Sequence, residues 1–181
     1  SIALDHKADI IIDIHPDGEY NPSAIPEALR QIRNKSQFVL GNRFTHLLEP
    51  IKSGMYIWKL IPLRLLNSLD SLIFGVRLND FHQGFRIYTK SMLNKVNFRE
   101  NSNDYLFSFE LIAQAIYENI KITQVPVETS YTGKKRGASL KNSIKYSLGT
   151  FKILFLFTLA KLGYKTKLFK KICYENTNNW Q

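Results

Sequence analysis

The first part of the chain alternates short apolar runs with longer segments in which apolar residues recur at helical spacing. A buried strand is predicted over 8–14, because a β-branched apolar run there ends at a Pro and a Gly. A helix is predicted to run to about Arg33 from Asn21 or Ser23, either of which can cap it. A second short strand over 37–40 completes a strand, helix, strand unit.

The rest of the pattern continues this alternation of strands and helices. A helix is expected over 54–74 with a kink at Pro62, since leucines recur there at helical spacing. Pro126 marks its own strand as an edge strand or a bulge. The remaining expected elements are strands over 76–78, 85–88 and 120–129 and helices over 105–119 and 140–163. This order predicts an α/β fold.

Positive charge is concentrated near the C-terminal end. Between Thr129 and Tyr174 there are 11 Lys or Arg and no Asp or Glu, which leaves 14 basic and 15 acidic residues elsewhere. Such a block favours phosphate-rich partners, either an anionic membrane surface or nucleic acid, and a solvated basic face is the plain alternative. The chain has no recognisable nucleic-acid recognition module, so no nucleic acid is expected as a partner.

The expected helix over 140–163 contains an uncharged run at 153–160, bounded by Lys152 and Lys161. The run has eight residues, and a simple helix needs about 20 apolar residues to cross a bilayer, so no spanning helix is predicted. Lysines at both ends can instead reach lipid headgroups while the apolar body lies in the membrane interface or against another helix.

Composition removes several classes of protein. At 181 residues and 44% hydrophobic composition, the chain is long enough for about one domain of roughly 150 residues and too apolar for disorder. The single cysteine, Cys173, excludes an internal disulfide framework and a thiolate zinc site. No signal peptide is recognised after Ser1, and the chain is expected to begin inside a longer product or to be processed.

The first candidate for chemistry is the segment HPDGEY, which follows the first predicted strand. Its side chains His15, Asp17 and Glu19 are expected to converge at the carboxyl end of a parallel strand, where open α/β sheets bind ligands. Oxygen ligands suit Mg²⁺ or Mn²⁺, which are often shared with substrate phosphates. The alternative is an ordinary turn at Asp17 with a surface histidine.

A second cluster runs from Asp80 to Arg86 and combines an acid, an imidazole, a glycine and a guanidinium. The arginine suits bidentate recognition of phosphate, and Gly84 permits close approach of a ligand to the backbone. A plain loop is the alternative. Glu110 lies in an apolar stretch, so it either pairs with a basic neighbour or faces a site, whereas Asp104 is more simply a helix N-cap.

Four segments, in order, resemble the second half of a family 2 glycosyltransferase of the dolichyl-phosphate mannose synthase-like or polyprenyl-phosphate sugar transferase-like branch. They are IIIDIHPDGEYNPSAIPEAL, FVLGNRF, LNDFHQGFRIYTK and NDYLFSFELIAQAIYENIKITQVPVETSY, and they cover roughly residues 8–150. The resemblance implies a partial GT-A (Rossmann-like) mixed sheet flanked by helices, with C-terminal interfacial helices. It also implies transfer of a sugar from a nucleotide-sugar to an acceptor with Mg²⁺ or Mn²⁺.

The family's metal motif, Asp-x-Asp, falls on residues 15–17. Asp17 matches its second acid, His15 replaces the first, and Glu19 matches a position where some relatives place a further ligand. A neutral imidazole can bind Mn²⁺, but it removes one negative charge that would help to hold Mg²⁺.

Other roles follow from the resemblance alone. Asp80 would orient the acceptor or act as a base, and Glu110 matches a helix acid beside the acceptor site. Lipid phosphates are already anionic nucleophiles, so strong base catalysis is not required. The residues expected to bind donor or acceptor phosphate are Arg43, His82, Gly84 and Arg86, and those expected in an acceptor loop are Lys134, Lys135 and Arg136.

The resemblance divides the chain into the C-terminal part of a GT-A domain at 1–138 and basic amphipathic membrane-associating helices at 139–181. The expected partners are a nucleotide-sugar, a polyprenyl-phosphate acceptor and an anionic membrane at its cytoplasmic face. The family's opening segments, which hold the nucleobase, have no counterpart here, so this chain alone is expected to be inactive or weak. The alternative is a non-catalytic scaffold that binds the membrane surface.

Overall fold

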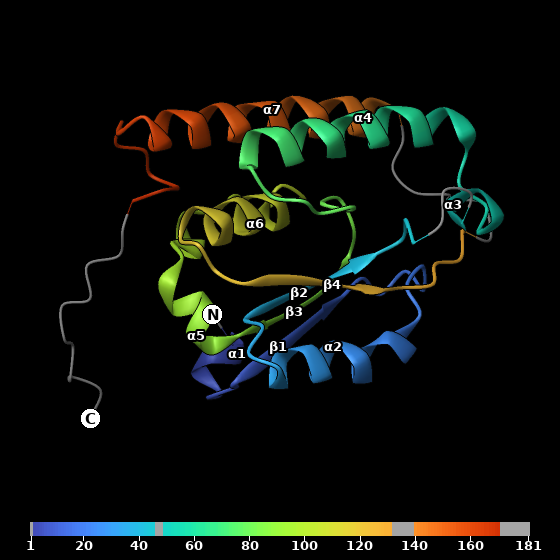
Figure 1. The fold of residues 1–181 in the computed structure, drawn as a ribbon, viewed down its shortest axis with the longest axis horizontal. Coiled ribbons are helices and arrows are strands. Elements are labelled where there is room, and N and C mark those ends of the chain that lie inside the picture. The colour runs from blue at the N-terminus through green and yellow to red at the C-terminus, as the bar shows by residue number, and fades with distance from the viewer. Residues whose placement is uncertain (1, 46–48, 132–139, 171–181) are drawn as a thin grey trace.

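A computed structural model describes residues 2–45, 49–131 and 140–170. Within these residues a four-stranded sheet is covered by helices on both faces, with α2 on one side and α4, α6 and α7 on the other (Figure 1). The elements are α1 Ile2–Asp5, β1 Ile10–Ile14, η1 Pro22–Ala24, α2 Ile25–Arg33, β2 Phe38–Asn42, α3 Glu49–Lys52, α4 Ile57–Phe74, β3 Phe85–Thr89, α5 Lys90–Lys95, η2 Phe98–Glu100, α6 Phe107–Tyr117, β4 Ile122–Pro126 and α7 Leu140–Lys161. The predicted α/β class is confirmed.

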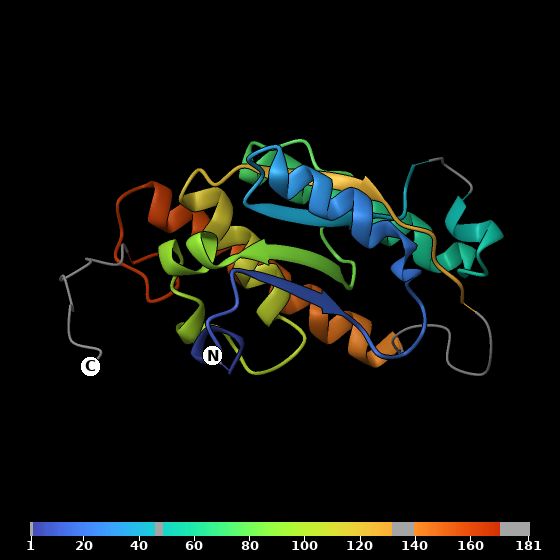
Figure 2. The ribbon, with the colours of Figure 1, turned by 90° about the horizontal axis from the view of Figure 1, so that it is seen from below.

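The sheet is mixed, in the order β1-β3-β2-β4. Strand β3 lies antiparallel between β1 and β2, while β2 and β4 are parallel. The predicted strand, helix, strand unit is therefore present as β1-α2-β2, but β3 separates its two strands, as Figure 2 shows from below. The strand predicted over 76–78 is wrong, because the chain there forms a loop after α4.

Strands β4 and β1 form the two edges of the sheet, and the sequence made a prediction for each of them. Strand β4, which ends at Pro126, lies at one edge, as its proline predicted. Strand β1 lies at the other edge, and Ile10 and Ile12 are 40% and 43% exposed, so the expectation of a buried strand is wrong. Its described neighbour, β3, is antiparallel, but β1 runs in the same direction as β2 and β4, so the carboxyl ends of these three strands lie at one edge of the sheet.

Alternation of side chains along the central strands builds two cores, because successive residues of a strand point to opposite faces. Val39 and Ile87 face α2, where they pack with Ala28. Phe38 and Leu40 face the other side and join the larger core beneath α6 and α7. The two cores fix β2 and β3 rigidly, and the loops at their ends carry the candidate site.

Helix α7 confirms the helix predicted over 140–163, and it packs into the larger core through Ile153, Leu154, Phe157 and Ala160. At 22 residues, α7 is long enough and apolar enough to cross a membrane, judged by length and composition only. This corrects the expectation that rested on the eight-residue run alone. The core contacts place one side of α7 against protein.

Helices α4 and α7 lie side by side as an outer layer on the larger core (Figure 1), and we call this pair the two-helix layer. Both helices expose large apolar side chains spaced mostly three or four residues apart. These are Ile57, Trp58, Ile61, Leu65 and Leu72 on α4 and Ile144, Leu148, Phe151 and Phe155 on α7. The exposed part of α4 was not expected from the sequence.

Candidate functional site

A pocket of about 1490 Å³ opens where the loop after β1, the loop before β3, and helices α4 and α7 meet. The predicted site residues that line it are His15, Asp17, Glu19, Arg43, His82, Gly84 and Arg86. Asp80 and Glu110 are buried and do not line it. The predicted acceptor-loop residues Lys134, Lys135 and Arg136 lie outside the described residues.

The segment after β1 combines the two interpretations that the sequence left open. Gly18 has a positive φ of 75°, and the Asp17 carboxylate accepts the Glu19 backbone N–H at 3.0 Å, so a turn is present. The Nδ1 atom of His15 also lies 3.7 Å from Oδ2 of Asp17. Metal bonds of about 2 Å allow two ligands of one ion to lie up to about 4 Å apart, so these donors fit a shared ion.

The donor set is small. Among the described residues there is no group of three or more His, Cys, Asp and Glu side chains placed to hold one ion. His15 and Asp17 therefore supply one nitrogen and one oxygen donor, both open to the pocket. Such a partial set suits an ion that takes its other ligands from substrate phosphates and water.

Gly84 joins the two clusters that the sequence predicted separately. A Cβ at this position would lie 2.9 Å from Cγ of His15 and 2.8 Å from Cε2 of Tyr20. Both contacts are closer than real side chains allow, so only glycine permits the His15 ring to lie against this loop.

Arg43 and Asp80 form a buried, bidentate ion pair between the end of β2 and the loop before β3. Nε of Arg43 lies 2.7 Å from Oδ2 of Asp80, and Nη2 lies 2.9 Å from Oδ1. The same guanidinium donates to the His82 carbonyl oxygen at 2.8 Å and to the Tyr131 hydroxyl at 3.0 Å. Most donors of Arg43 are thus used within the protein, and the pair fixes the floor of the pocket.

Arg86 has fewer partners than Arg43. Its side chain is 5% exposed, its Nη1 lies 3.4 Å from the Asp13 carboxylate, and its Nη2 donates to the Gln83 carbonyl oxygen. Its buried Nε has no hydrogen-bond partner among the residues that the structure describes. A guanidinium with an unused donor at a pocket is suited to an anionic ligand.

Among the residues that the structure describes, Glu110 forms no ion pair with a basic side chain, and it does not line the pocket. Its carboxylate accepts the Ser102 backbone N–H at 2.6 Å and the Ser102 hydroxyl at 3.0 Å. Ser102 itself lines the pocket, so Glu110 holds one wall in place. Asp104 accepts the Leu106 N–H at 2.8 Å, but the N-cap position of α6 is Leu106 rather than Asp104.

Two residues of the site have no counterpart in the sequence predictions. Asp70 on α4 lies 2.7 Å from Nε2 of His82, and the Tyr146 hydroxyl on α7 lies 2.9 Å from Nδ1 of the same ring. One turn earlier on α4, Asn67 accepts the Phe81 N–H at 2.8 Å. Buried polar residues three apart in an otherwise apolar helix were the signal that could have identified Asn67 and Asp70.

Tyr20 carries a pH prediction. Burial raises the pKa of Tyr20 from 10.0 to about 12, so the folded chain keeps a proton that the unfolded chain releases. The contribution of Tyr20 to stability is complete below pH 10 and is lost between pH 10 and 12, by about 1.4 kcal/mol per pH unit. In urea unfolding from pH 8 to 11, Tyr20→Phe is expected to flatten the decline, whereas the exposed control Tyr56→Phe should not.

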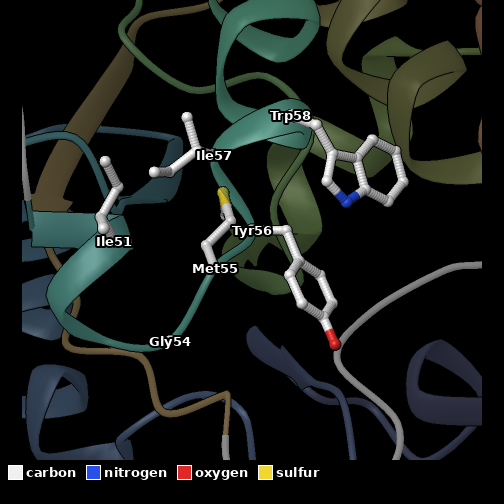
Figure 3. A pocket seen from close by; sticks show the side chains of 6 residues that line it. All are labelled: Ile51, Gly54, Met55, Tyr56, Ile57 and Trp58. Carbon is white, nitrogen blue, oxygen red and sulfur yellow. The ribbon is translucent and has the colours of Figure 1, made fainter.

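A smaller apolar pocket of about 610 Å³ lies where α3 is joined to α4 (Figure 3). The Tyr56 and Trp58 rings stack with their centroids 6.2 Å apart. Met55 and Trp58 line both this pocket and the larger one, so the two pockets adjoin at these side chains. The smaller pocket therefore lies between the larger one and the exposed apolar residues at the start of α4.

A comparison with models of known protein families finds no match. The chain is 26% identical over 162 residues to a UDP-N-acetylglucosamine–dolichyl-phosphate N-acetylglucosaminyltransferase of Methanococcus voltae, covering 89% of this chain and 62% of the relative. It is 21% identical over 149 residues to a polyprenol monophosphomannose synthase of Mycolicibacterium smegmatis, covering 80% and 53%. The chain thus spans between half and two thirds of the length of these relatives.

Solved structures of glucosyl-3-phosphoglycerate synthase from Mycobacterium tuberculosis have a similar fold. The complex with Mn²⁺, UDP and phosphoglyceric acid matches with a TM-score of 0.55 and 14% identity, over 87% of this chain and 50% of that one. The complex with Mn²⁺, UDP-glucose and phosphoglyceric acid matches with a TM-score of 0.51. The chain therefore has the fold of about half of a GT-A glycosyltransferase, and its sequence is similar to those of dolichyl- and polyprenyl-phosphate sugar transferases.

Proposed function

We propose that this chain belongs to an enzyme that transfers a sugar from a nucleotide-sugar to a polyprenyl phosphate with the help of Mg²⁺ or Mn²⁺. The observation that carries the proposal is the pocket itself, which is lined both by the His15 and Asp17 donors and by the buried, incompletely bonded Arg86. A metal-bound diphosphate and a second phosphate require these two kinds of group in one pocket. The name of the Methanococcus voltae relative contains both kinds of substrate, and that of the Mycolicibacterium smegmatis relative contains the polyprenol alone.

In this proposal each part of the pocket has one task. His15 and Asp17 would hold the ion, which when bound offsets the negative charge of the departing nucleoside diphosphate. Arg86 binds the acceptor phosphate, and the Arg43–Asp80 pair holds the loop before β3 against the end of β2. The acceptor is an anionic nucleophile, so no free base is needed, in keeping with the hydrogen-bonded, buried state of Asp80 and Glu110.

The smaller pocket supports a lipid acceptor rather than a small polar one. It adjoins the larger pocket at Met55 and Trp58, and its side chains are largely apolar. From there the exposed apolar residues of α4 continue along the two-helix layer. A prenyl chain whose phosphate lies at Arg86 would follow this path out of the pocket.

The two-helix layer supports attachment to the surface of an anionic membrane. Its exposed apolar side chains are accompanied by Lys141, Lys145 and Lys152 on α7, and Lys59 lies near the start of α4. Apolar area and basic charge together are what interfacial helices use to bind anionic lipids. We therefore extend the proposed membrane-associating part, residues 139–181, by adding α4, which packs against α7.

Metal binding tests the catalytic proposal. Calorimetric titration of the chain with Mn²⁺, and then with inorganic pyrophosphate in the presence of Mn²⁺, is expected to show binding that Asp17→Ala weakens at least tenfold; pyrophosphate replaces the nucleotide because the segments that hold the nucleobase have no counterpart here. Asp5→Ala in α1 removes an equal charge far from the pocket and is the matched control. A correctly folded chain that binds neither ligand would contradict the proposal and favour the alternative, a non-catalytic scaffold on the membrane surface.

Flotation with lipid vesicles tests the membrane proposal. The chain is expected to float with vesicles containing about 30% phosphatidylserine and to float less with neutral vesicles, because basic residues add electrostatic attraction. The double variant Leu65→Glu with Leu148→Glu should abolish flotation, since it places charge within the exposed apolar side chains. The charge-matched control, Ser23→Glu with Asn34→Glu on the opposite side of the sheet, should float normally; equal loss in both variants would contradict the assignment.

A further inference from the structure

A chain of three polar side chains crosses from α4 to α7 through the loop before β3. Asp70 on α4 lies 2.7 Å from Nε2 of His82, and Nδ1 of His82 lies 2.9 Å from the Tyr146 hydroxyl on α7. Asp70 and the His82 side chain are almost completely buried, and the His82 ring stacks on Phe109 with centroids 5.2 Å apart. His82 and Tyr146 both line the large pocket.

The hydrogen bonds of this chain depend on a single proton. With Asp70 ionised and His82 neutral, Nε2–H must donate to the carboxylate, so Nδ1 is an acceptor and the Tyr146 O–H donates to it. The Tyr146 oxygen then offers only lone pairs to the pocket. In this state Tyr146 would repel a phosphate oxygen.

Adding one proton reverses the direction of the second hydrogen bond. If the proton is on His82, both ring nitrogens donate. If it is on Asp70, the carboxyl O–H donates to Nε2, and the neutral ring then carries its hydrogen on Nδ1. In both cases Nδ1–H donates to the Tyr146 oxygen, which frees the Tyr146 O–H to donate into the pocket.

The charges around this chain favour proton uptake when an anion binds. The charged groups that act on the Tyr146 hydroxyl are Arg86, Asp70, Asp80 and Arg43. Asp80 also accepts the His82 backbone N–H at 3.3 Å, but it is neutralised by its ion pair with Arg43. Burial raises the pKa of Asp70. The hydrogen bond from His82 lowers it by less, so the carboxylate takes up a proton more readily than an exposed aspartate does.

Arg86, whose charge acts on the Tyr146 hydroxyl, also has an unused donor. Nε of Arg86 is buried and has no partner among the described residues, although Arg86 lines the same pocket as Tyr146. An anion at Arg86 would add negative charge beside the Asp70 and His82 pair, which stabilises the protonated form of that pair. Anion binding and proton uptake are therefore coupled.

We propose that Tyr146 binds the phosphate group held by Arg86, and that Asp70 and His82 are positioning residues that convert Tyr146 from acceptor to donor by taking up one proton as the phosphate arrives. The inference rests on the proposed function only in assigning this phosphate to a polyprenyl acceptor. The proton, when it is taken up, stays on the Asp70 and His82 pair, and no covalent bond is formed.

Calorimetry measures both parts of the proposal. Sulfate is a tetrahedral dianion that does not titrate near neutral pH, so any proton taken up on its binding passes from the buffer to the protein. Titrations at pH 7.5 in two buffers of different ionisation enthalpy are expected to show uptake of up to one proton by the wild-type chain. Tyr146→Phe should bind sulfate about tenfold more weakly, the usual effect of one hydrogen bond to a charged group.

Two further variants locate the proton. Asp70→Asn combined with His82→Gln keeps two polar side chains that cannot be protonated, so sulfate binding should lose its proton uptake and its dependence on pH. His15→Gln removes the other imidazole of the pocket and should retain the uptake. In the free wild-type chain at pH 8, nitrogen NMR of His82 is expected to show the hydrogen on Nε2.

The outcomes separate this inference from the proposed function. Equal affinity and equal proton uptake in wild type and Tyr146→Phe would overturn the inference, and so would a hydrogen on Nδ1 in the free chain or no binding of sulfate. Geranyl monophosphate serves as the lipid-phosphate probe in parallel. If sulfate shows the expected pattern but geranyl monophosphate does not bind, the polyprenyl acceptor is wrong while the role of Tyr146 stands.

Discussion

Asp80→Ala is expected to destabilise the fold by about 3–5 kcal/mol, because it leaves the buried Arg43 guanidinium without its carboxylate. Both side chains are buried, and the lost contacts include two short hydrogen bonds between Arg43 and Asp80. Urea unfolding followed by circular dichroism measures the change. If the variant fails to fold, the same effect can be measured with Asp80→Asn, which keeps part of the hydrogen bonding.

A surface ion pair and a double variant act as controls. Glu27→Ala breaks the pair between Glu27 and Arg30, which is exposed, so little or no change in stability is expected. Arg43→Met combined with Asp80→Leu should recover much of the loss, since replacing both charges removes the unpaired one. If Asp80→Ala were as mild as Glu27→Ala, the pair would not be holding the floor of the pocket.

Phe157→Ala is expected to cost about 3–5 kcal/mol, the range for removing a large side chain from a packed core. Phe157 is 2% exposed, and its ring lies 4.8 Å from that of Phe74, which attaches α7 to α4. Phe155, two residues earlier on the same helix, is 63% exposed. Phe155→Ala should change stability by less than about 0.5 kcal/mol.

The same two variants separate folding from membrane binding. Phe155→Ala is expected to weaken flotation with anionic vesicles while the chain remains stable, because its side chain belongs to the exposed part of the two-helix layer. Unfolding experiments and vesicle flotation on both variants measure the two effects. A loss of stability in Phe155→Ala equal to that in Phe157→Ala would show that Phe155 is buried in the core rather than exposed on α7.

Much of the local structure could be predicted from periodicity. Local sequence patterns, namely apolar spacing and helix caps, predicted helices α2, α4, α6 and α7, and a proline predicted that β4 lies at an edge. Strand β1 was placed correctly but was wrongly expected to be buried, and β3 is its described neighbour. Its apolar run has the composition of a central strand, and composition does not say which neighbours a strand has.

Some residues of the site could be predicted from the sequence, and others could not. The sequence indicated His15, Asp17 and Arg86, since polar residues after an apolar strand and a Gly-Phe-Arg loop are local patterns. The ion pair between Arg43 and Asp80 could not be predicted, because it joins residues 37 positions apart in the sequence. The hydrogen bond between Tyr146 and His82 could not be predicted either, because it joins residues 64 positions apart. In the sequence, the helix of Tyr146 is recognisable only as apolar and basic.

The sequence by itself determined the positions of the main elements, the α/β class, the clusters at strand ends and the resemblance to polyprenyl-phosphate sugar transferases. The tertiary structure alone decided the insertion of β3 between β1 and β2, the burial of the Arg43–Asp80 pair and the chain from Asp70 through His82 to Tyr146. The physical reason is the range of the interactions. Periodicity records which face of an element is buried, whereas hydrogen bonds and ion pairs between distant segments form only when packing brings those faces together.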